Sequence, residues 1–299
     1  MKDGGIQPEG SPVSEGLHLV DGDIIAYRCA AATDGRYYLV GDVEFQYKGD
    51  AIRFCKMNNF PLDKIEQHFD PEPVSHAIHL MKDMINRMET IEIYLSDKRN
   101  FRFDILESYK ASRKNKRRPK WLSECKKWLV KHKGATIADD LEADDAIIIR
   151  STELDAEGVP HKIASIDKDL KQKHGIHYDF INDVTEEISE AGARRNLWLQ
   201  ICSGDTTDDI YSPHGLGPAR ADAFYKKQGV DWEETSDQEL YKLTHDLYMT
   251  WLKQEEGEDE QAFIDRAKDL LDTVAPLVYL LRSKDDKWIQ QTKEAKEVA

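Results

Sequence analysis

The sequence predicts an α/β protein with a mostly parallel central sheet and helices on both of its faces. Short apolar runs, each about the length of one strand, alternate along the first two thirds of the chain with stretches whose apolar residues recur at helical spacing. Strands that alternate with helices pair in parallel, because each crossover helix returns the chain to the same edge of the sheet. Asp21, Asp97 and Asp167 each directly follow one of the apolar runs, which is typical of a site at the carboxyl edge of such a sheet. The 299 residues, 40% of them hydrophobic, can bury a substantial core.

The first elements are predicted from local patterns. Residues 17–20 are apolar and form the first strand, and the helical pattern from Ile24 to Ala32 follows, with Asp23 as its expected N-cap. Residues 36–48 alternate around Gly41 and the aspartate that follows it, which is the pattern of a hairpin.

The remaining elements follow from the helical and strand periodicities. In chain order they are a short helix at about 49–58, a proline-rich loop through residue 73, a helix at 74–89, a strand at 91–95, a helix at about 121–132, a weak strand at 135–137, a helix at 143–154, strands at 161–166 and 175–181, and a helix at 185–202. From about residue 205 onward only the helical period remains, so we expect a separate helical region there.

We therefore divide the chain into three regions. Residues 1–16 are polar and rich in Gly and Pro, so we expect a flexible leader; residues 17–203 form the α/β region, and residues 204–299 form a helical region with an acidic tail. No run of 18 apolar residues exists, so we expect no membrane partner. The four cysteines are widely spaced and form no C-x-x-C pair, which indicates reduced thiols in a cytoplasmic protein.

Charge is strongly segregated along the chain. The net charge of −15 argues against a nucleic-acid partner when it is taken as an average. However, residues 110–133 hold eleven Lys or Arg and one Glu, a local charge of +10, so the rest of the chain sits near −25. This segregation indicates a basic binding segment on an acidic protein.

Three short acidic strings carry the predicted chemistry. They are Leu-Glu-Ala-Asp-Asp at 141–145, Ile-Asp-Lys-Asp at 166–169 and Gly-Asp-Thr-Thr-Asp-Asp at 204–209. Single acids at such positions are usually helix caps or turn formers. Three adjacent acids are more than one cap requires, and carboxylates gathered at one place repel each other unless a cation neutralises them. Ligands that are all oxygen favour Mg²⁺ or Mn²⁺ over zinc.

The segment from Lys110 to Lys120 holds seven Lys or Arg in eleven residues and no acid. Basic runs are more often solvated faces than binding sites. This one is preceded by Tyr109, interrupted by Pro119 and followed by Trp121, and its cations repel one another, so we expect a mobile segment that becomes ordered on phosphate. An acidic metal cluster beside a basic segment suggests hydrolysis of a polyanion, of which nucleic acid is the obvious candidate.

A tight turn, Gly215-Leu-Gly217-Pro218, opens a helix in the last third of the chain. Such a junction is often structural only. Its functional interpretation is a nest of backbone N–H groups at a helix N-terminus, which binds phosphate without reading bases.

Taken in order, these residues resemble the structure-specific 5′ nucleases, a family of phage 5′→3′ exonucleases, 5′-nuclease domains of bacterial DNA polymerases and flap endonucleases. The resemblance covers about residues 17–228 and is greatest to the short phage exonucleases. The motifs that carry it are Leu-Val-Asp21-Gly, Asp97, Phe101-Arg102 with Tyr109-Lys110-Ala-Ser-Arg113, Glu142-Ala-Asp144-Asp145, Asp167-Lys-Asp169, and Gly204-Asp205-x-x-Asp208-Asp209-Ile leading into Gly215-Leu-Gly217.

The resemblance implies a PIN-like fold with a short basic helical arch at about 109–133 and a helix–three-turn–helix at about 204–228. It implies that nine acids surround two or more Mg²⁺ or Mn²⁺ ions: Asp21, Asp97, Glu142, Asp144, Asp145, Asp167, Asp169, Asp205 and Asp208. Lys110 and Arg113 would grip the scissile phosphate and act in catalysis with Asp144 and Asp167, and the Gly215–Gly217 turn often binds K⁺ in this family. The expected DNA contacts are Arg102, Tyr109, Lys110, Arg113, Lys114, Lys116, Arg117, Arg118, Lys120, Gly215, Gly217 and Arg220.

The implied activity is metal-dependent hydrolysis of DNA with 5′ ends, flaps or nicks, with RNA in RNA–DNA hybrids as a further substrate. We expect a monomer that acts in replication or repair, in the host bacterial cytoplasm if a phage encodes it. Asp209 departs from the family, which usually has Asn there, and Ile210-Tyr-Ser-Pro-His departs from the usual approach to the Gly-x-Gly turn, which puts the K⁺ site in doubt.

Two alternatives stay open. Val20-Asp21-Gly-Asp23 and Gly204-Asp-x-x-Asp-Asp209 also resemble the haloacid-dehalogenase phosphatases, in which the first aspartate is a nucleophile. That interpretation leaves the acids at 142–145 and the basic segment unexplained. The other alternative is a DNA-binding replication protein that kept the fold and lost its chemistry, for which missing acids would be the signature.

Overall fold

The structure is a computed structural model that describes residues 16–213, 215–255 and 260–288. The predicted leader therefore lies, except for Gly16, outside the described residues, as does the end of the acidic tail. None of the helices that the structure describes is both long enough and apolar enough to span a bilayer.

A six-stranded sheet forms the centre of the protein, in the order β6-β5-β1-β7-β8-β9. The strands are β1 (Leu17–Asp21), β5 (Thr90–Leu95), β6 (Thr136–Ile137), β7 (His161–Ala164), β8 (Gly175–Asp179) and β9 (Val184–Ile188). All neighbours pair in parallel except β8 and β9, and Val20 at the centre lies opposite Ile93 on one side and Ala164 on the other. The prediction of a mostly parallel sheet is confirmed.

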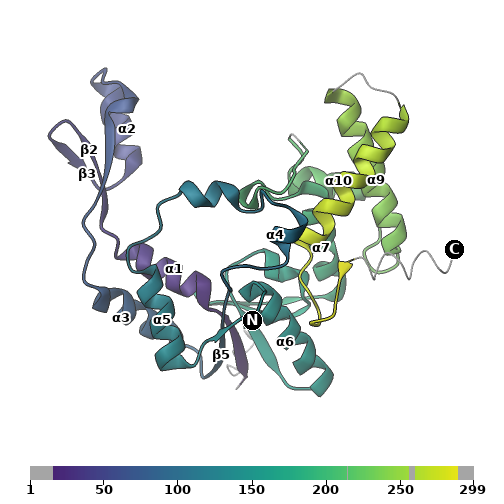
Figure 1. Cartoon of the computed structure of the whole chain (residues 1–299), viewed down its shortest axis with the longest axis horizontal. Coiled ribbons are helices and arrows are strands. Elements are labelled where there is room, and N and C mark those ends of the chain that lie inside the picture. Colours follow the sequence, from purple (N-terminus) through teal and green to yellow (C-terminus); the bar gives the residue numbers. More distant parts are fainter. Residues whose placement is uncertain (1–15, 214, 256–259, 289–299) are drawn as a thin grey trace, which may run out of the picture.

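Helices cover both faces of this sheet (Figure 1). On one face, α1 (Gly22–Ala32), α3 (Val74–Ile85) and α5 (Leu122–Lys133) pack on Val20 and its neighbours, and on the other face α6 (Ala143–Glu157) packs on Leu19. Because successive side chains of a strand point to opposite faces, Leu19 and Val20 contribute to different cores. Both are fully buried.

The last third of the chain is helical. It comprises α7 (Glu190–Ser203), α8 (Pro218–Lys227), α9 (Asp237–Glu255) and α10 (Glu260–Val278). These helices share one core, which includes Trp198, Tyr225, Tyr248 and Leu271. The short α4 (Arg102–Ile105) also contacts α10, so the helical region packs against the loops that follow β5.

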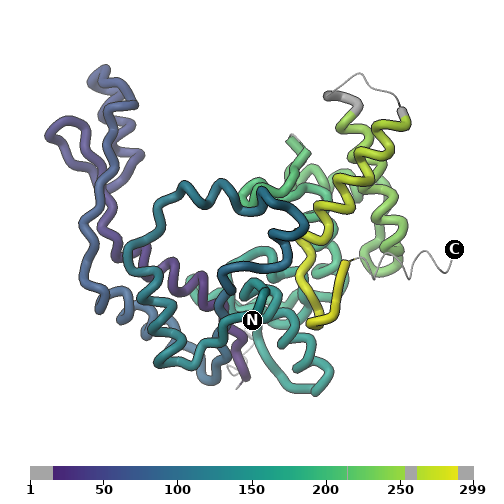
Figure 2. Tube along the Cα trace, viewed as in Figure 1, coloured from purple at the N-terminus to yellow at the C-terminus, as the bar shows by residue number. Residues whose placement is uncertain are grey.

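A small antiparallel sheet projects from the main body beside α1 and α3 (Figures 1 and 2). It contains β2 (Arg36–Val40), β3 (Val43–Phe45) and β4 (Ile65–Phe69), covered by α2 (Lys48–Met57), and Tyr38, Val40, Ala51 and Cys55 form its core. The β2–β3 hairpin and α2 agree with the prediction. We define the neck of this small sheet as residues 33–36 and 69–72, where the chain enters and leaves.

Three local predictions were wrong. The proline-rich loop contains β4, which pairs with the whole of β2. The helix predicted at 185–202 begins only at Glu190, since residues 184–188 form β9. An aspartate turn closes this hairpin: the Asp179 carboxylate accepts hydrogen bonds from the N–H groups of Ile181 and Asn182, and Asp183 takes a positive φ of 56°.

The third wrong prediction concerns the N-cap of α1. Its N-cap is Asp21, whose carboxylate accepts a hydrogen bond from Ile24 N at 3.1 Å. Asp23 lies in the first turn instead, where its carboxylate accepts from Ser96 N and pairs with Lys126.

Candidate active site

A large cleft lies at the carboxyl ends of β1, β5 and β7. Its volume is about 1660 Å³, and its walls combine the acidic strings with the basic segment 110–120. Parallel strands end at the same edge of a sheet, and α6 begins there, which is how acids more than 140 residues apart in sequence meet. The acids that line it are Asp21, Asp23, Asp97, Glu142, Asp144, Asp167, Asp169, Asp205 and Asp208.

The innermost acids repel one another. Burial, together with the neighbouring charges of Asp23 and Asp167, raises the pKa of Asp21 to about 7. Burial and the charge of Asp21 hold the pKa of Asp144 well above its usual range. Burial, with Asp167 beside it, raises the pKa of Asp169 to about 7. Carboxylates in such a state favour a bound cation, because a cation offsets both the burial and the repulsion.

Hydroxyl and amide groups hold these acids in place. Ser165 Oγ donates to Asp21 Oδ2 at 3.0 Å and accepts from Asp167 N at 3.0 Å, so one serine links two strand ends. The side-chain amide of Gln200 on α7 donates to Asp169 at 2.6 Å, and that of Asn100 donates to Glu142 at 2.9 Å. Ser165, Gln200 and Asn100 were not predicted, since isolated polar residues carry no spacing signal.

The basic segment begins inside the acid cluster. Lys110 Nζ lies 2.5 Å from Glu142 Oε1 and 3.4 Å from Asp208 Oδ2, and Arg113 pairs with Asp208. Burial acts to raise the pKa of Glu142, but Lys110 beside it outweighs burial and the pKa is lowered. Burial raises the pKa of Asp208, although Lys110 and Arg113 act to lower it. Lys110 takes a positive φ of 54°, a strained conformation for a lysine that its backbone hydrogen bond to Asp208 O helps to hold.

Tyr109 is buried beside these ion pairs. Its hydroxyl donates to Glu142 at 3.1 Å and lies 3.5 Å from Asp208. Tyr109 is 2% exposed and has no free face on which a base could stack. We therefore infer that it positions Glu142 and Asp208 rather than making the predicted contact with DNA.

Arg102 and Asp145 form a buried ion pair beside the cluster, with Arg102 Nη1 4.0 Å from Glu142 Oε2. The Asp145 carboxylate binds the guanidinium of Arg102 through both oxygens, at 2.5 and 2.9 Å, and neither residue is more than 1% exposed. Arg102 also donates to Leu277 O and Tyr279 O. This burial contradicts the predicted contact of Arg102 with DNA, and it turns Asp145 away from the acids with which it was grouped.

Asp97 and Asp209 occupy the margins of the site. Asp97 accepts from Lys98 N at 2.6 Å and from Asp140 N at 3.3 Å at the end of β5. Asp209 takes a positive φ of 59° and accepts from Ser112 N at 2.7 Å. Asn and Asp are the non-glycine residues that best tolerate this backbone region, so Asp209 suits the turn.

The outer wall of the cleft is basic. Lys114, Lys116, Arg118 and Lys120 are exposed on the segment, as its predicted role requires. The wall also contains cations that were not predicted: Arg28 on α1 and Lys126, Lys127 and Lys131 on α5. The i, i+4 spacing of Lys127 and Lys131 was a usable signal for one basic face of that helix.

The chemistry of these donors fits divalent metal ions. The potential ligands that cluster there are carboxylates, and burial together with their mutual repulsion raises the pKa values of Asp21, Asp144 and Asp169. Among the described residues, no three Asp, Glu, His or Cys side chains already converge as a ready-made metal cage. The ammonium of Lys110 and the guanidinium of Arg113 lie among the acids in this conformation.

The turn before α8 is built as predicted at Gly215 and Gly217. Gly215 has a φ of +75°, Gly217 is the N-cap of α8, and Pro218 occupies the first turn. Arg220, predicted to contact DNA, donates to Gly215 O at 2.7 Å and closes the turn. His214 lies outside the described residues.

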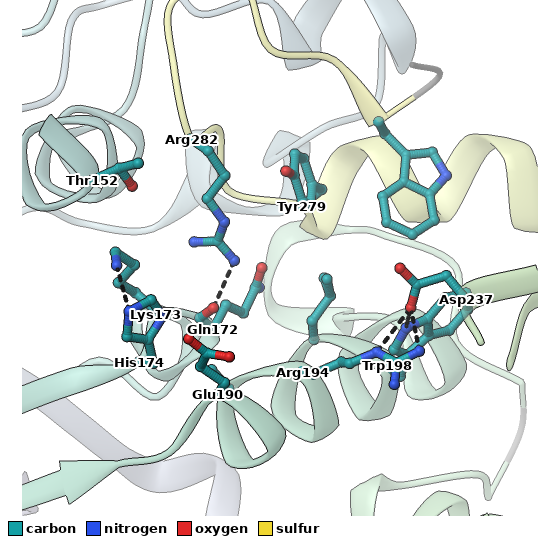
Figure 3. A pocket seen from close by; sticks show the side chains of 13 residues that line it. Thr152, Gln172, Lys173, His174, Glu190, Arg194, Trp198, Asp237, Tyr279 and Arg282 are labelled. Carbon is teal, nitrogen blue, oxygen red and sulfur yellow. Dashed lines mark hydrogen bonds and ion pairs between the residues drawn. The ribbon is translucent and has the colours of Figure 1, made fainter. Parts of the chain in front are cut away.

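A second, smaller pocket of about 270 Å³ lies between α7 and the chain around Tyr279–Trp288 (Figure 3). Its cations already have partners: Lys173 pairs with Asp155, Arg194 with Asp237, and Arg282 donates to Gln172 O at 2.6 Å. The acidic cleft is therefore the stronger candidate for the reaction.

No protein-family model and no curated protein sequence matches this chain. Solved structures do. A bacteriophage T5 5′-exonuclease with bound divalent metal ions (zinc) has a TM-score of 0.55 at 16% identity, covering 95% of this chain and 99% of its own. The T5 D15 protein co-crystallised with metal ions has a TM-score of 0.52 at 14% identity, covering 95% and 100%. The D15 flap endonuclease in a pseudo-enzyme-product complex with DNA and metal ions has a TM-score of 0.52 at 14% identity, covering 95% of this chain and 99% of its own.

This chain has the 5′-nuclease fold. The likeness extends over almost the whole of the chain, including the helical region that follows the sheet. The expected fold is thereby confirmed, and the acidic cleft is the feature of this 5′-nuclease fold from which a function can be argued.

Proposed function

We propose that this protein is a divalent-metal-dependent 5′→3′ exonuclease and flap endonuclease that hydrolyses DNA phosphodiesters. The observation that carries the proposal is the junction of a buried carboxylate cluster with a basic segment whose first two cations reach into it. The solved structures with this fold are exonucleases and flap endonucleases, and their names include bound metal ions and DNA.

We propose that four residues hold the metals: Asp21, Asp144, Asp167 and Asp169. Three more acids lie at the edge of the same cluster: Glu142, Asp205 and Asp208. Bound Mg²⁺ or Mn²⁺ would supply a nucleophilic water and neutralise charge on the phosphate. In this arrangement Lys110 and Arg113 exchange their acidic partners for the phosphoryl oxygens of the substrate, where their charge counts most in the transition state. Asp97 lies at the margin of the cluster, and we keep it as an outer candidate.

The exposed cations and the Gly215–Gly217 turn contact phosphates, so binding should depend on salt and little on sequence. We extend the proposal to 5′ ends, flaps and nicks, to RNA in RNA–DNA hybrids, to a K⁺ ion at the turn and to a monomer that works in replication or repair in a phage-infected cytoplasm. These finer features rest on the resemblance of the motifs.

The phosphatase alternative is disfavoured by the setting of Asp21. Both Asp21 oxygens are held in place, one as the cap of α1 and the other by Ser165, and at 2% exposure the carboxylate suits a fixed metal ligand better than a nucleophile that must reach a phosphate. The non-catalytic alternative is disfavoured because eight of the nine predicted acids line the cleft.

The test is cleavage of 5′-labelled blunt, flapped and nicked duplexes with and without Mg²⁺. Asp144→Asn and Asp167→Asn should each lower the single-turnover rate at least about a hundred-fold, since each removes charge that the metals require. DNA binding in Ca²⁺ should persist. Asp139→Asn, at an exposed position outside the cleft lining, is the matched control. Undiminished Mg²⁺-dependent cleavage in both cleft variants would overturn the proposal.

A further inference from the structure

The small sheet beside the cleft has no role in the chemistry proposed above. Its neck, however, contacts the far end of the basic segment. At this end Arg117 binds the Asp34 carboxylate through both terminal nitrogens, one of them at 3.1 Å, and Lys120 N donates to Asp34 Oδ1 at 3.0 Å. Asp34 is only 4% exposed, so one buried carboxylate receives three donors from the segment.

The second chain segment of the neck, residues 69–72, contributes as well. The guanidinium carbon of Arg117 lies 3.4 Å from the ring centroid of Phe69, a close cation–π contact. Trp121 Nε1 donates to Glu72 O at 2.7 Å. Pro119, between these residues, is buried, whereas its neighbours are exposed. Both chain segments of the neck therefore hold the same end of the basic segment.

The neck itself is a fixed structure. Its two chain segments are joined by backbone hydrogen bonds from Asp70 N to Gly35 O and from Glu72 N to Thr33 O, each of 2.9 Å. Gly35 has a φ of +56°, and a Cβ there would lie 1.8 Å from Asp70 O, so only glycine permits this approach. A rigid neck can hold a segment whose own charges repel one another.

We propose that the neck is an anchor for the outer end of the basic segment and that Asp34 is its positioning residue. The inner end is held at the acid cluster by Lys110 and Arg113, so anchoring the outer end suspends Lys114, Lys116 and Arg118 over the cleft. Without the anchor these residues become a loop attached at one end, and DNA must supply the cost of ordering them.

The consequence for catalysis, which rests on the proposed nuclease function, is selective. Asp34→Asn should raise KM for a 5′-flap duplex by at least roughly ten-fold, because ordering one or two residues costs that much affinity. The kcat should stay within about two-fold, since Lys110 and Arg113 keep their own contacts with the acid cluster.

The deciding experiment needs no nuclease activity. Limited trypsin digestion of the full chain, with the first cut mapped by mass spectrometry, reports how firmly Lys114, Lys116 and Arg117 are held. Asp34→Asn should speed cleavage in this segment roughly ten-fold. Phe69→Leu, which leaves the neck hydrogen bonds intact, should speed it less, and Asp42→Asn at the exposed hairpin turn should leave it unchanged.

Circular dichroism establishes that each variant is folded. Parental cleavage rates in both folded Asp34→Asn and Phe69→Leu would overturn the anchor, and so would a fall in kcat with KM unchanged. If the parent protein and all variants fail to cleave DNA, the proposed function fails, but the trypsin result still decides the anchor.

Discussion

The buried pair between Arg102 and Asp145 offers a sharp prediction, because sequence and structure assign Asp145 to different roles. The perturbation is Asp145→Asn, which keeps the shape of the side chain and removes its charge. The Arg102 guanidinium would then lie at 1% exposure with two carbonyls and a neutral amide as its hydrogen-bond partners, and with the Glu142 carboxylate 4.0 Å away. Leu281 N, which donates to Asp145 Oδ1 at 3.2 Å, would also lose a charged acceptor.

The expected cost is large. Removing one partner of a buried, hydrogen-bonded ion pair typically costs about 3–5 kcal/mol, because the other charge stays buried. For a chain of this size that corresponds to a fall in Tm of roughly 5–8 °C. The pair joins α4, α6 and the chain after α10, so the loss should affect the whole unit rather than one loop.

The assay is thermal unfolding followed by circular dichroism, in EDTA and again in Mg²⁺. Asp139→Asn, an exposed change on the loop before α6, is the control and should shift stability by no more than about 0.5 kcal/mol. A double variant, Arg102→Met with Asp145→Leu, should recover part of the loss. If Asp145→Asn melts like the control in EDTA but loses its stabilisation by Mg²⁺, then Asp145 is a metal ligand and our reasoning is refuted.

Three further predictions concern stability and rate. The folded pKa of Asp21 is raised from 3.8 to about 7, so the folded state binds the proton more tightly; in EDTA its stability should fall as pH rises from about 4 to 7, by up to about 4 kcal/mol. Asp21→Asn should flatten this slope in urea unfolding, and an equal slope would contradict the shift. Gly204→Ala should lower the free energy of unfolding by at least about 2 kcal/mol, since its φ is +61° and a Cβ would lie 1.8 Å from Tyr211 O; Gly134→Ala, with a φ of +67° and open space, should cost about 1 kcal/mol. Tyr109→Phe should slow single-turnover cleavage several-fold, since it frees the cluster acids from their hydroxyl donor, and an unchanged rate would remove the positioning role.

The main architecture and most of the cleft were predictable because both follow from strand geometry. Apolar runs that alternate with helices predict parallel strands, and an aspartate at the end of such a strand lies at the reactive edge whatever the details of packing. Asp21 and Asp167 could therefore be placed together from sequence, and the structure puts them in one cleft. The basic segment was recognisable from composition alone.

Local elements failed where a polar sequence hid a strand. In β9, two glutamates between Thr185 and Ile188 gave the sequence a helical appearance, yet pairing with β8 decided the outcome. In β4 the strand forms because β2 offers an edge, not because its own residues favour it strongly. Pairing energy of this kind depends on a partner elsewhere in the chain.

By itself the sequence determined the α/β class, the acidic edge of the sheet and the charge of the segment above it. Only the tertiary structure decided which acids face the cleft. Asp144 and Asp145 are adjacent, but successive residues of a helix point about 100° apart, so one joins the cluster and the other meets Arg102 in the core. Likewise only the fold brings Asp34 to Arg117, 83 residues away. The rotation of a helix and the partner of a carboxylate are set by packing, which composition and spacing do not contain.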